Sequence, residues 1–341
     1  MPGCHNAKPA MKKKTSLADI ARSLGVSKTL VSLVLNGKAD QYGINRETRE
    51  KVREKARELN YQPDALARIF RTGRTMTVGL LVPDISDASQ AIMARQIEDM
   101  AREHGYTLIV CSTDGDPTRE ADQIRLLRER RTDGIIVSAS QVPAETFQEL
   151  LQEGYPHVLI GHTDADSGSP AVSSDSFWGA SLAASHLLEE GFHEIGMVLP
   201  GPAHTRGIRE YRQGFISRLA EGGLEVLPDR IIEVSGPHAG RDLDEALNRL
   251  FESGGMPSAL FVPDISLTGA CMLSLKKRNL RIPEDVALVG FGDLPWFTLA
   301  SPPISAIAQP LDEMGRQAFT MLLEQMSGNR GPAGMQSMHL P

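Results

Sequence analysis

Apolar residues recur at helical spacing in two short segments near the start of the chain, with polar residues between them. The first segment has one apolar face, made by Leu17, Ile20, Ala21 and Leu24, and the second has another, made by Val31, Val34 and Leu35. Ser16 and Ser27 precede the two segments as candidate N-caps. The pattern therefore predicts two short helices joined by a tight turn at Gly25.

The outward side of the second predicted helix carries short polar or cationic side chains, those of Lys28, Thr29, Ser32 and Asn36. Such side chains can enter the major groove of DNA. Two short helices that meet at a glycine also occur in ordinary helical bundles. The pattern alone leaves both interpretations open.

A third helix is predicted after the candidate N-cap Asn45, because Val52, Ala56 and Leu59 form an apolar stripe on an otherwise charged segment. This helix would close a three-helix head. Pro63 ends the head, and a helix of about two turns over residues 64–70 precedes a linker over 71–75. A helix this short needs a partner, DNA or a twin helix, to be stable.

From Thr77 onward, apolar strands alternate with amphipathic helices. Strands are predicted over residues 77–83, 106–112, 134–139, 157–161, 195–200, 258–262 and 286–291. Helices are predicted between them over residues 91–104, 119–130, 176–190, 206–221, 242–253 and 266–278. This order is typical of an α/β fold with parallel sheets that helices cover on both faces. Ligands of such folds bind beyond the carboxyl ends of the strands, where the loops over 83–90 and 291–296 begin.

Charge is distributed unevenly between these two parts of the chain. Residues 1–75 contain sixteen Lys or Arg and seven Asp or Glu, whereas the remainder contains twenty and thirty-six. The whole-chain net charge of −7 hides this reversal of sign. A basic segment on an acidic body favours a head that binds nucleic acid over a fragment of a helical bundle.

Other features of the composition exclude several classes of protein. The 341 residues predict two or three folded units. Cys4, Cys111 and Cys271 are widely spaced, which predicts reduced thiols in a cytoplasmic protein. No apolar run reaches the length of a membrane span, and no hydrophobic segment follows the basic residues 12–14 as in a secretory signal. The same argument disfavours an exported binding protein.

Residues 1–14 are expected to form a disordered basic tail, of which residues 1–10 could be an extension before Met11. We find no nucleophile elbow, phosphate-binding glycine loop or cluster with metal-ligand spacing. We therefore expect the chain to be no enzyme and to use neither a cofactor nor a metal ion.

Ordered motifs run through almost the whole chain. Those of the head are Leu-Ala-Asp-Ile-Ala-x-x-x-Gly-Val-Ser over 17–27, Val-Ser at 31–32, Leu-Asn-Gly over 35–37, Glu-Thr-Arg-Glu-x-Val over 47–52 and Leu-Asn-Tyr-x-Pro-x-Ala-Leu-Ala-Arg over 59–68. Those of the body include Thr-Val-Gly-Leu-Leu-Val-Pro-Asp-Ile over 77–85, Arg-Thr-Asp-Gly-Ile-Ile-Val over 131–137, Ile-Pro-Glu-Asp-Val-Ala-Leu-Val-Gly-Phe over 282–291 and Ile-Ala-Gln-Pro over 307–310. From about residue 16 to 340 the chain resembles the lactose/galactose-repressor (LacI/GalR) family of bacterial transcription regulators.

The resemblance implies a helix-turn-helix head over residues 15–61, a hinge helix and linker over 62–75, and a two-lobed core over 76–341 like that of periplasmic binding proteins. The first lobe is expected over 76–171 and 303–330, and the second over 172–302. The family implies a homodimer, by analogy a repressor, whose two heads bind a palindromic operator in double-stranded DNA. A small effector, expected to be sugar-related, would bind in the cleft between the lobes.

The family's motifs also imply roles for particular residues toward DNA. The expected base-reading residues are Lys28, Thr29, Ser32 and Leu33. The expected contacts to the DNA backbone are Ser16, Ser27, Asn36 and Arg68. In the hinge, Leu66, Ala67 and Phe70 are expected at the minor groove, where phenylalanine can act as a wedge.

Three departures from the family's head are informative. Leu33 stands at a position that is often polar; it can contact a thymine methyl group or enlarge the head's core beside Leu30. Phe70 replaces the usual leucine, and it could instead pack against its twin or the core. The loop that ends near Ile44 is about three residues longer than usual, which affects the placement of the third helix.

The expected effector residues are Asp87, Ser89, Gln90, Ser174, Tyr211, Asp264, Asp293 and Gln309. Several depart from the family. Asp-Ala-Ser-Gln over 87–90 replaces an Asn-Pro-Phe-Phe type of loop, and Tyr211 stands where an arginine commonly grips the ligand, which disfavours a carboxylate ligand. An alternative is a DNA-binding regulator with a vestigial cleft, independent of an effector or controlled by a protein. Related chains continue beyond a His-Leu-Pro segment, so we expect either a truncated chain or a second lobe without an edge strand.

Overall fold

The computed structural model describes residues 15–61, 72–139, 142–161, 167–201, 205–234, 238–328 and the backbone of 338–340. The chain divides into two compact units, 1–75 and 76–341. The predicted tail over 1–14 lies outside the described residues. So does most of the predicted hinge, including Leu66, Ala67, Arg68 and Phe70.

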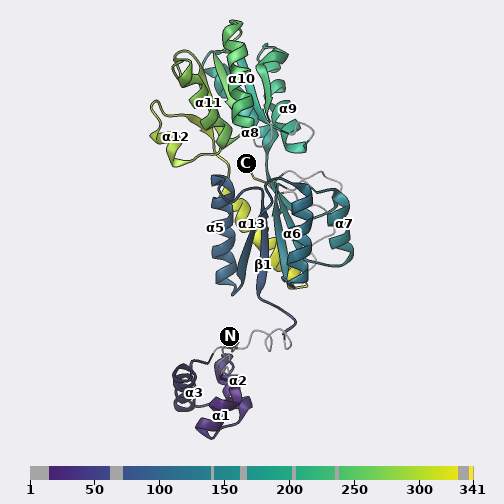
Figure 1. Cartoon of the computed structure of the whole chain (residues 1–341), viewed down its shortest axis with the longest axis vertical. Helices are drawn as coiled ribbons and strands as arrows, with labels where there is room; N and C mark the ends of the chain where they lie inside the picture. The colour runs from purple at the N-terminus through teal and green to yellow at the C-terminus, as the bar shows by residue number, and fades with distance from the viewer. Residues whose placement is uncertain are drawn as a thin grey trace, which may run out of the picture. The chain divides into compact units, whose positions relative to one another are not determined.

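The first unit contains the three predicted helices of the head: α1 (Leu17–Leu24), α2 (Lys28–Leu35) and α3 (Arg46–Glu58) (Figure 1). Gly25 ends α1 in the left-handed conformation with φ of 66°, which glycine adopts without steric cost. The Ser27 hydroxyl caps α2 by accepting the N–H of Leu30, and the Asn45 side chain caps α3 by accepting that of Thr48. The predicted turn and N-caps of α2 and α3 are confirmed.

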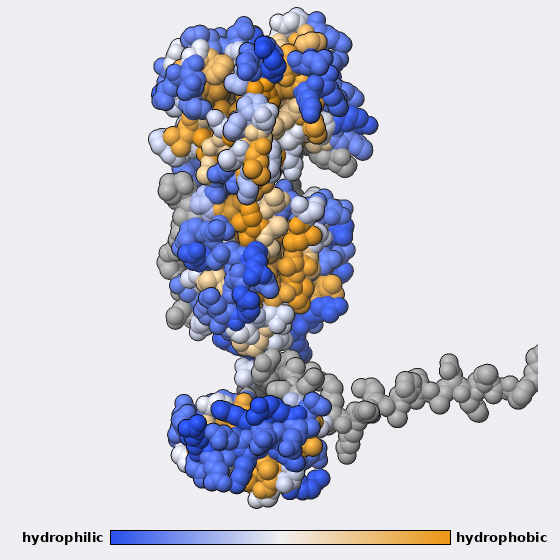
Figure 2. All heavy atoms as spheres, turned by 90° about the vertical axis from the view of Figure 1, so that its left-hand side faces the viewer, coloured by the Kyte–Doolittle hydropathy of each residue, from blue (hydrophilic) through white to orange (hydrophobic). Residues whose placement is uncertain are grey.

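The core of the head brings together one face of each helix. Its buried members include Ile20, Val31, Val34 and Val52, as the apolar spacing predicts. Ala39, in the longer loop between α2 and α3, is also buried, and its carbonyl accepts the N–H of Ile44. The extra loop residues therefore leave α3 in its predicted place. The visible face of the head is mainly hydrophilic in Figure 2.

The second unit contains a six-stranded parallel sheet, sheet A, with the strand order β11-β5-β4-β3-β1-β2. Its strands are β1 (Thr77–Val82), β2 (Thr107–Ser112), β3 (Gly134–Ser138), β4 (His157–Ile160), β5 (Ala171–Ser174) and β11 (Met338–Leu340). Helices α5 (Ala88–Glu103) and α13 (Leu311–Met326) cover one face, and α6 (Pro117–Glu129) and α7 (Ala144–Gln152) cover the other. This layered body is the first lobe.

A five-stranded parallel sheet, sheet B, has the order β10-β9-β8-β6-β7 and forms the second lobe. Its strands are β6 (Ile195–Pro200), β7 (Ile231–Val234), β8 (Ala259–Val262), β9 (Ala287–Phe291) and β10 (Ser305–Ile307). Helices α8 (Ser176–Glu189) and α9 (Arg206–Glu221) cover one face, and α10 (Ala239–Glu252) and α11 (Ile265–Lys277) the other, with the short α12 (Pro295–Leu299) beside them. The predicted α/β class and the helix-covered parallel sheets are confirmed.

The predicted lobe boundaries differ from the strand pairing. A boundary at residue 171 divides β5, which pairs with β4 and β11 in sheet A. A first lobe that resumes at residue 303 includes β10, which pairs with β9 in sheet B. The chain therefore passes between the sheets after β5 and after β10. Both strands have only three or four residues, too few for a clear alternating or apolar run.

The same shortness explains why the prediction did not include the strands β5, β7, β10 and β11. The prediction also omitted the helices α7, α12 and α13, although α13 is 16 residues long. Helix α13 packs against α5 and the strands of sheet A from the far end of the sequence. No helix in the described ranges is long and apolar enough to cross a membrane.

Candidate functional site

The outward face of α2 carries the four residues predicted to read bases. Lys28 and Thr29 are exposed, and Ser32 and Leu33 are half-buried, while Val31 and Val34 face the core of the head. Within the described residues, Lys28 forms no ion pair. By contrast, charges along α3 pair with one another, as in Lys51 with Glu47. The positive charge on α2 is therefore not neutralised within the described head.

Leu30 and Leu33 have different surroundings, although both are half-buried. Leu30 packs against the core of the head, whereas Leu33 lies outside that cluster. The interpretation of Leu33 as an extension of the core beside Leu30 is therefore not supported. Its role in reading a base stays a prediction.

The polar residues predicted to contact the DNA backbone lie at the ends of α1 and α2. The Ser16 hydroxyl donates to Asp19 at 2.7 Å, and Asp19 also accepts the backbone N–H of Ser16. At the end of α2, the amide of Asn36 donates to the carbonyl of Ser32 at 2.6 Å and to its hydroxyl at 3.1 Å. These bonds hold both side chains in place. We call the outward face of α2, with Lys28, Thr29, Ser32 and Leu33, the recognition face.

In the second unit, Asp87 is the N-cap of α5. Its Oδ1 accepts the N–H groups of Ser89 at 3.0 Å and Gln90 at 3.1 Å, and also the hydroxyl of Ser89. The sequence predicted a loop here and a helix only from residue 91. The carboxylate starts the helix three residues earlier, so Ser89 and Gln90 belong to its first turn.

Asp264 has the same role at α11, where its Oδ1 accepts the N–H of Leu267 at 2.7 Å. The hydroxyl of Ser266, in the first turn of α11, donates to Oδ2 of Asp87 at 3.5 Å. Burial raises the pKa of Asp264, and the neighbouring Asp87 carboxylate raises it further. The first turns of α5 and α11, from different lobes, therefore meet through two acidic N-caps; we call this place the acidic junction.

Tyr211 lies beside the acidic junction but within the core of the second lobe. Its ring is 8% exposed and makes an edge contact with Phe291 at 5.1 Å between centroids. Burial raises the pKa of its hydroxyl to about 12 against the opposing effect of a hydrogen bond with Ser176, and the charge of Asp264 contributes to the rise. The hydroxyl is thus neutral and near the carboxylate of Asp264.

The other predicted effector residues lie where the chain passes between the sheets. Gln309 donates from Nε2 to the Ser174 hydroxyl at 2.9 Å, which joins the segments after β10 and at the end of β5. Both line a mainly apolar cavity of about 220 Å³ together with Trp178 and Leu182 of α8. Asp293 is exposed after β9. Gly292, with φ of 90°, brings that loop against Ile265 at the start of α11.

Sequence reasoning missed two residues of this region, Ser266 and Ser176, which bond to Asp87 and Tyr211. Both serines lie one or two residues after an N-cap aspartate. This position at the start of a helix was the signal in the sequence that could have identified them.

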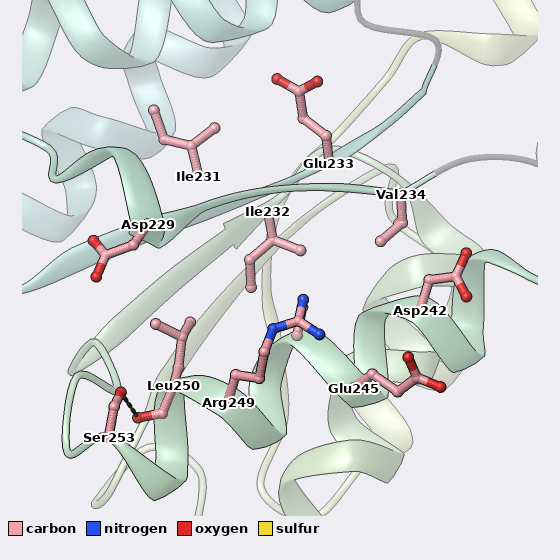
Figure 3. A pocket seen from close by; sticks show the side chains of 11 residues that line it. Asp229, Ile231, Ile232, Glu233, Val234, Asp242, Glu245, Arg249, Leu250 and Ser253 are labelled. Carbon is pink, nitrogen blue, oxygen red and sulfur yellow. Dashed lines mark hydrogen bonds between the residues drawn. The ribbon is translucent and has the colours of Figure 1, made fainter.

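A second cavity of about 560 Å³ lies at the edge of sheet B, between β7 and α10 (Figure 3). Ile232 and Leu250 line it with Arg249 beside them. None of the predicted effector residues lines this cavity.

Comparisons with known proteins agree with this architecture. Residues 16–64 match the model for bacterial regulatory proteins of the lacI family, and residues 184–340 match the periplasmic binding protein-like domain. The HTH-type transcriptional repressor PurR of Vibrio cholerae is 31% identical over 326 residues, covering 95% of both chains.

Two solved structures share the fold. A lac repressor dimer bound to operator and the anti-inducer ONPF has a TM-score of 0.82 at 20% identity, covering 96% of this chain and 97% of that one. The complex of the transcriptional regulator CelR with cellobiose has a TM-score of 0.69 at 23% identity, with the same coverage.

The helix-turn-helix head, the two parallel sheets and the full-length similarity to a repressor converge on one class of protein. The chain is a DNA-binding transcriptional regulator and belongs to the lacI family of bacterial regulatory proteins.

Proposed function

We propose that this regulator is a repressor that binds a palindromic operator as a homodimer and is controlled by a small ligand bound between its two lobes. The observation that carries the DNA-binding part is the outward face of α2, where Lys28 and Thr29 are exposed opposite the buried Val31. A helix of this kind presents side chains to base edges in the major groove. Two heads in a symmetric dimer match two symmetric half-sites.

The proposed DNA contacts fall into two groups. Contacts to base edges determine which base sequence is bound, and they come from Lys28, Thr29, Ser32 and Leu33. Contacts to the DNA backbone fix the position of the head along the duplex, and they come from Ser16, Ser27, Asn36 and Arg68. In the hinge, Leu66, Ala67 and Phe70 enter the minor groove at the centre of the operator.

The ligand acts by preferring one arrangement of the lobes. A ligand that binds both arrangements equally changes nothing, whatever its affinity. The acidic junction joins the lobes through the contact of Ser266 with Asp87. A molecule bound there changes the relation of the lobes, and through the dimer the spacing of the two heads.

Selection from a pool of random double-stranded DNA tests the DNA-binding part. We expect enrichment of a sequence with two inverted half-sites, bound by the full chain with an affinity that falls steeply with salt. Lys28→Ala should weaken binding and change the preferred base at one position of each half-site. Lys51→Ala, on the charged face of α3, is the matched control and should leave the preferred sequence unchanged. Absence of any enriched sequence would refute the proposal.

A second candidate function is an effector-independent regulator with a vestigial cleft. The burial of Tyr211 and the bond between Gln309 and Ser174 favour it, because these predicted effector residues already have partners within the protein. A true effector stabilises the folded protein by mass action. A thermal-shift screen therefore distinguishes the two: a stabilising ligand that also changes operator affinity excludes the second candidate.

A further inference from the structure

Residues 37–43 join α2 to α3, and we call this segment the α2–α3 loop. It begins at the end of the recognition face, because the N–H of Lys38 donates to the carbonyl of Leu33 at 2.9 Å. Gly37 turns the chain just after α2, in the left-handed conformation with φ of 72°. The loop is therefore attached to the C-terminal end of the helix that is proposed to read the bases.

The loop has a fixed shape. Ala39 is 2% exposed, and its carbonyl accepts the N–H of Ile44 at 3.0 Å. The N–H of Gly43 donates to the carbonyl of Asp40 at 3.2 Å. From α3, Nε of Arg49 donates to the carbonyl of Ile44 at 2.5 Å. Side chains on a loop held in this way lose little conformational freedom when they bind a partner.

The side chains that the loop presents to solvent are suited to an anionic partner. The negative charge of Asp40 is offset by an ion pair with Arg49, whose side chain is 23% exposed. Lys38 is exposed and forms no ion pair within the described residues. Tyr42 is 64% exposed, and no described residue bonds to its hydroxyl. The loop thus offers one unpaired positive charge and one free hydroxyl donor.

The length of α2 determines where the loop would lie on DNA. A helix of eight residues is about 12 Å long, which is about the width of the major groove. The two ends of such a helix reach the two walls of the groove, and these walls are rows of phosphates. Since the loop follows the C-terminal end of α2, it would lie against one of these walls.

We infer that the α2–α3 loop is a further DNA-binding surface, on which the ammonium group of Lys38 and the hydroxyl of Tyr42 bind phosphates beside each half-site. This inference rests on the proposed binding of an operator by the recognition face. Both groups donate hydrogen bonds to phosphate oxygens, and such contacts add affinity without reading the sequence. The base preference remains with residues such as Lys28.

The variants Lys38→Ala and Tyr42→Phe test the inference in the full chain, by fluorescence anisotropy with the selected operator over a range of salt concentrations. Lys38→Ala removes one phosphate contact per head, so the slope of log affinity against log salt should become shallower by about two for a dimer. Tyr42→Phe removes a neutral donor and should weaken binding about tenfold at an unchanged slope. Neither variant should change the preferred sequence. Lys51→Ala, whose lysine pairs with Glu47, is the control and should leave the slope unchanged.

Operators with a single neutral methylphosphonate in place of one phosphate locate the contact. We expect the wild type to lose affinity at a position beside each half-site, and Lys38→Ala to lose no more at that position. Both substituted side chains are exposed, so the melting temperature of the head should not change. A folding defect would lower it and would be detected separately.

The inference would be overturned if both variants bound the operator with the affinity and salt slope of the wild type, or if every methylphosphonate affected Lys38→Ala and the wild type equally. In that case the selected operator is still bound, and the proposed function stands. The salt slope is also measured on a random-sequence duplex, because phosphate contacts persist in non-specific binding. A shallower slope of Lys38→Ala there would support the loop contact even if no operator were selected and the proposed function failed.

Discussion

The recognition face of α2 and the acidic junction are built in opposite ways. The first is a single helix of eight residues, and its functional side chains are neighbours in the sequence. The second joins Asp87 to Ser266, which are 179 residues apart, through one long hydrogen bond. The proposed specificity of the head is therefore local in the sequence, whereas the proposed ligand site exists only when both lobes have folded.

The two regions also differ in electrostatics. The recognition face presents Lys28 without an ion-pair partner among the described residues, on a segment with an excess of basic residues. The acidic junction presents carboxylates, and burial raises the pKa of one of them. The opposite signs favour different partners for the two regions, and separate mutations should affect them separately.

The largest difference between the effects on the head and on the core is expected from Ile20→Ala, which removes a fully buried side chain from the core of the head. A buried isoleucine contributes about 2–5 kcal/mol, and a domain of this size has little stability to lose. The head should unfold and specific operator binding should disappear, while the melting temperature of the core stays unchanged. Calorimetry combined with gel-shift assays measures both. Parallel loss of the core transition would show that the two units fold as one.

Gly214→Ala is the converse change in the core. A Cβ at this position would lie 2.1 Å from the carbonyl oxygen of Phe177, where α8 and α9 pack closely. Neither backbone can yield easily, so we expect a loss of about 1–3 kcal/mol from the core. The dispersion of the head's amide NMR signals should remain native. An unchanged melting temperature would mean that the two helices do not approach each other this closely.

Leu33→Ala and Leu30→Ala compare two half-buried leucines of α2 that have different surroundings. Leu33 lies outside the core of the head, so its truncation should change stability little but should reduce discrimination at one base pair by about 1–3 kcal/mol. Leu30→Ala should instead lower the head's stability. Replacement of thymine by deoxyuridine in the selected operator tests the methyl contact directly. Equal sensitivity to deoxyuridine in the wild type and in Leu33→Ala would exclude it.

The smallest effect is expected from Asp264→Asn in the absence of a ligand. A carboxyl group whose pKa is raised on folding contributes stability below its unfolded pKa and loses that contribution as the pH rises through the folded pKa. The variant should therefore melt slightly above the wild type at pH 7.5, and the difference should shrink as the pH falls. A difference that does not change with pH would show that the carboxylate is well solvated.

Much of the fold could be predicted from the sequence, because its signals are local. The N-caps Ser27 and Asn45, the turn at Gly25 and the apolar faces of three helices were sufficient for the head. The longer strands β1, β3 and β9 are continuous apolar runs and were found. The strands β5, β10 and β11 were missed, and the predicted lobe boundaries placed β10 and most of β5 in the wrong lobe. A strand of three or four residues is too short to show a clear alternating or apolar pattern.

The proposed ligand site was harder to predict, because its residues meet only through tertiary packing. Asp87 and Asp264 could be selected one at a time, but their common contact depends on the packing of two lobes. The start of α5 at Ala88 was also hidden, since a run of small and polar residues precedes its apolar face. Tyr211 was expected in the cleft, and its burial against Phe291 follows from tertiary packing that no local pattern reports.

The coupling of the two regions is most directly tested by the affinity for the operator, measured with and without each ligand that stabilises the core. Linkage requires that a ligand which changes operator affinity by a given factor has its own affinity changed by the operator by the same factor. We predict at least a fivefold change, equal in both directions, and its loss in the variant with both Asp87→Asn and Asp264→Asn. Ligands that stabilise the core but leave operator affinity unchanged would contradict the account.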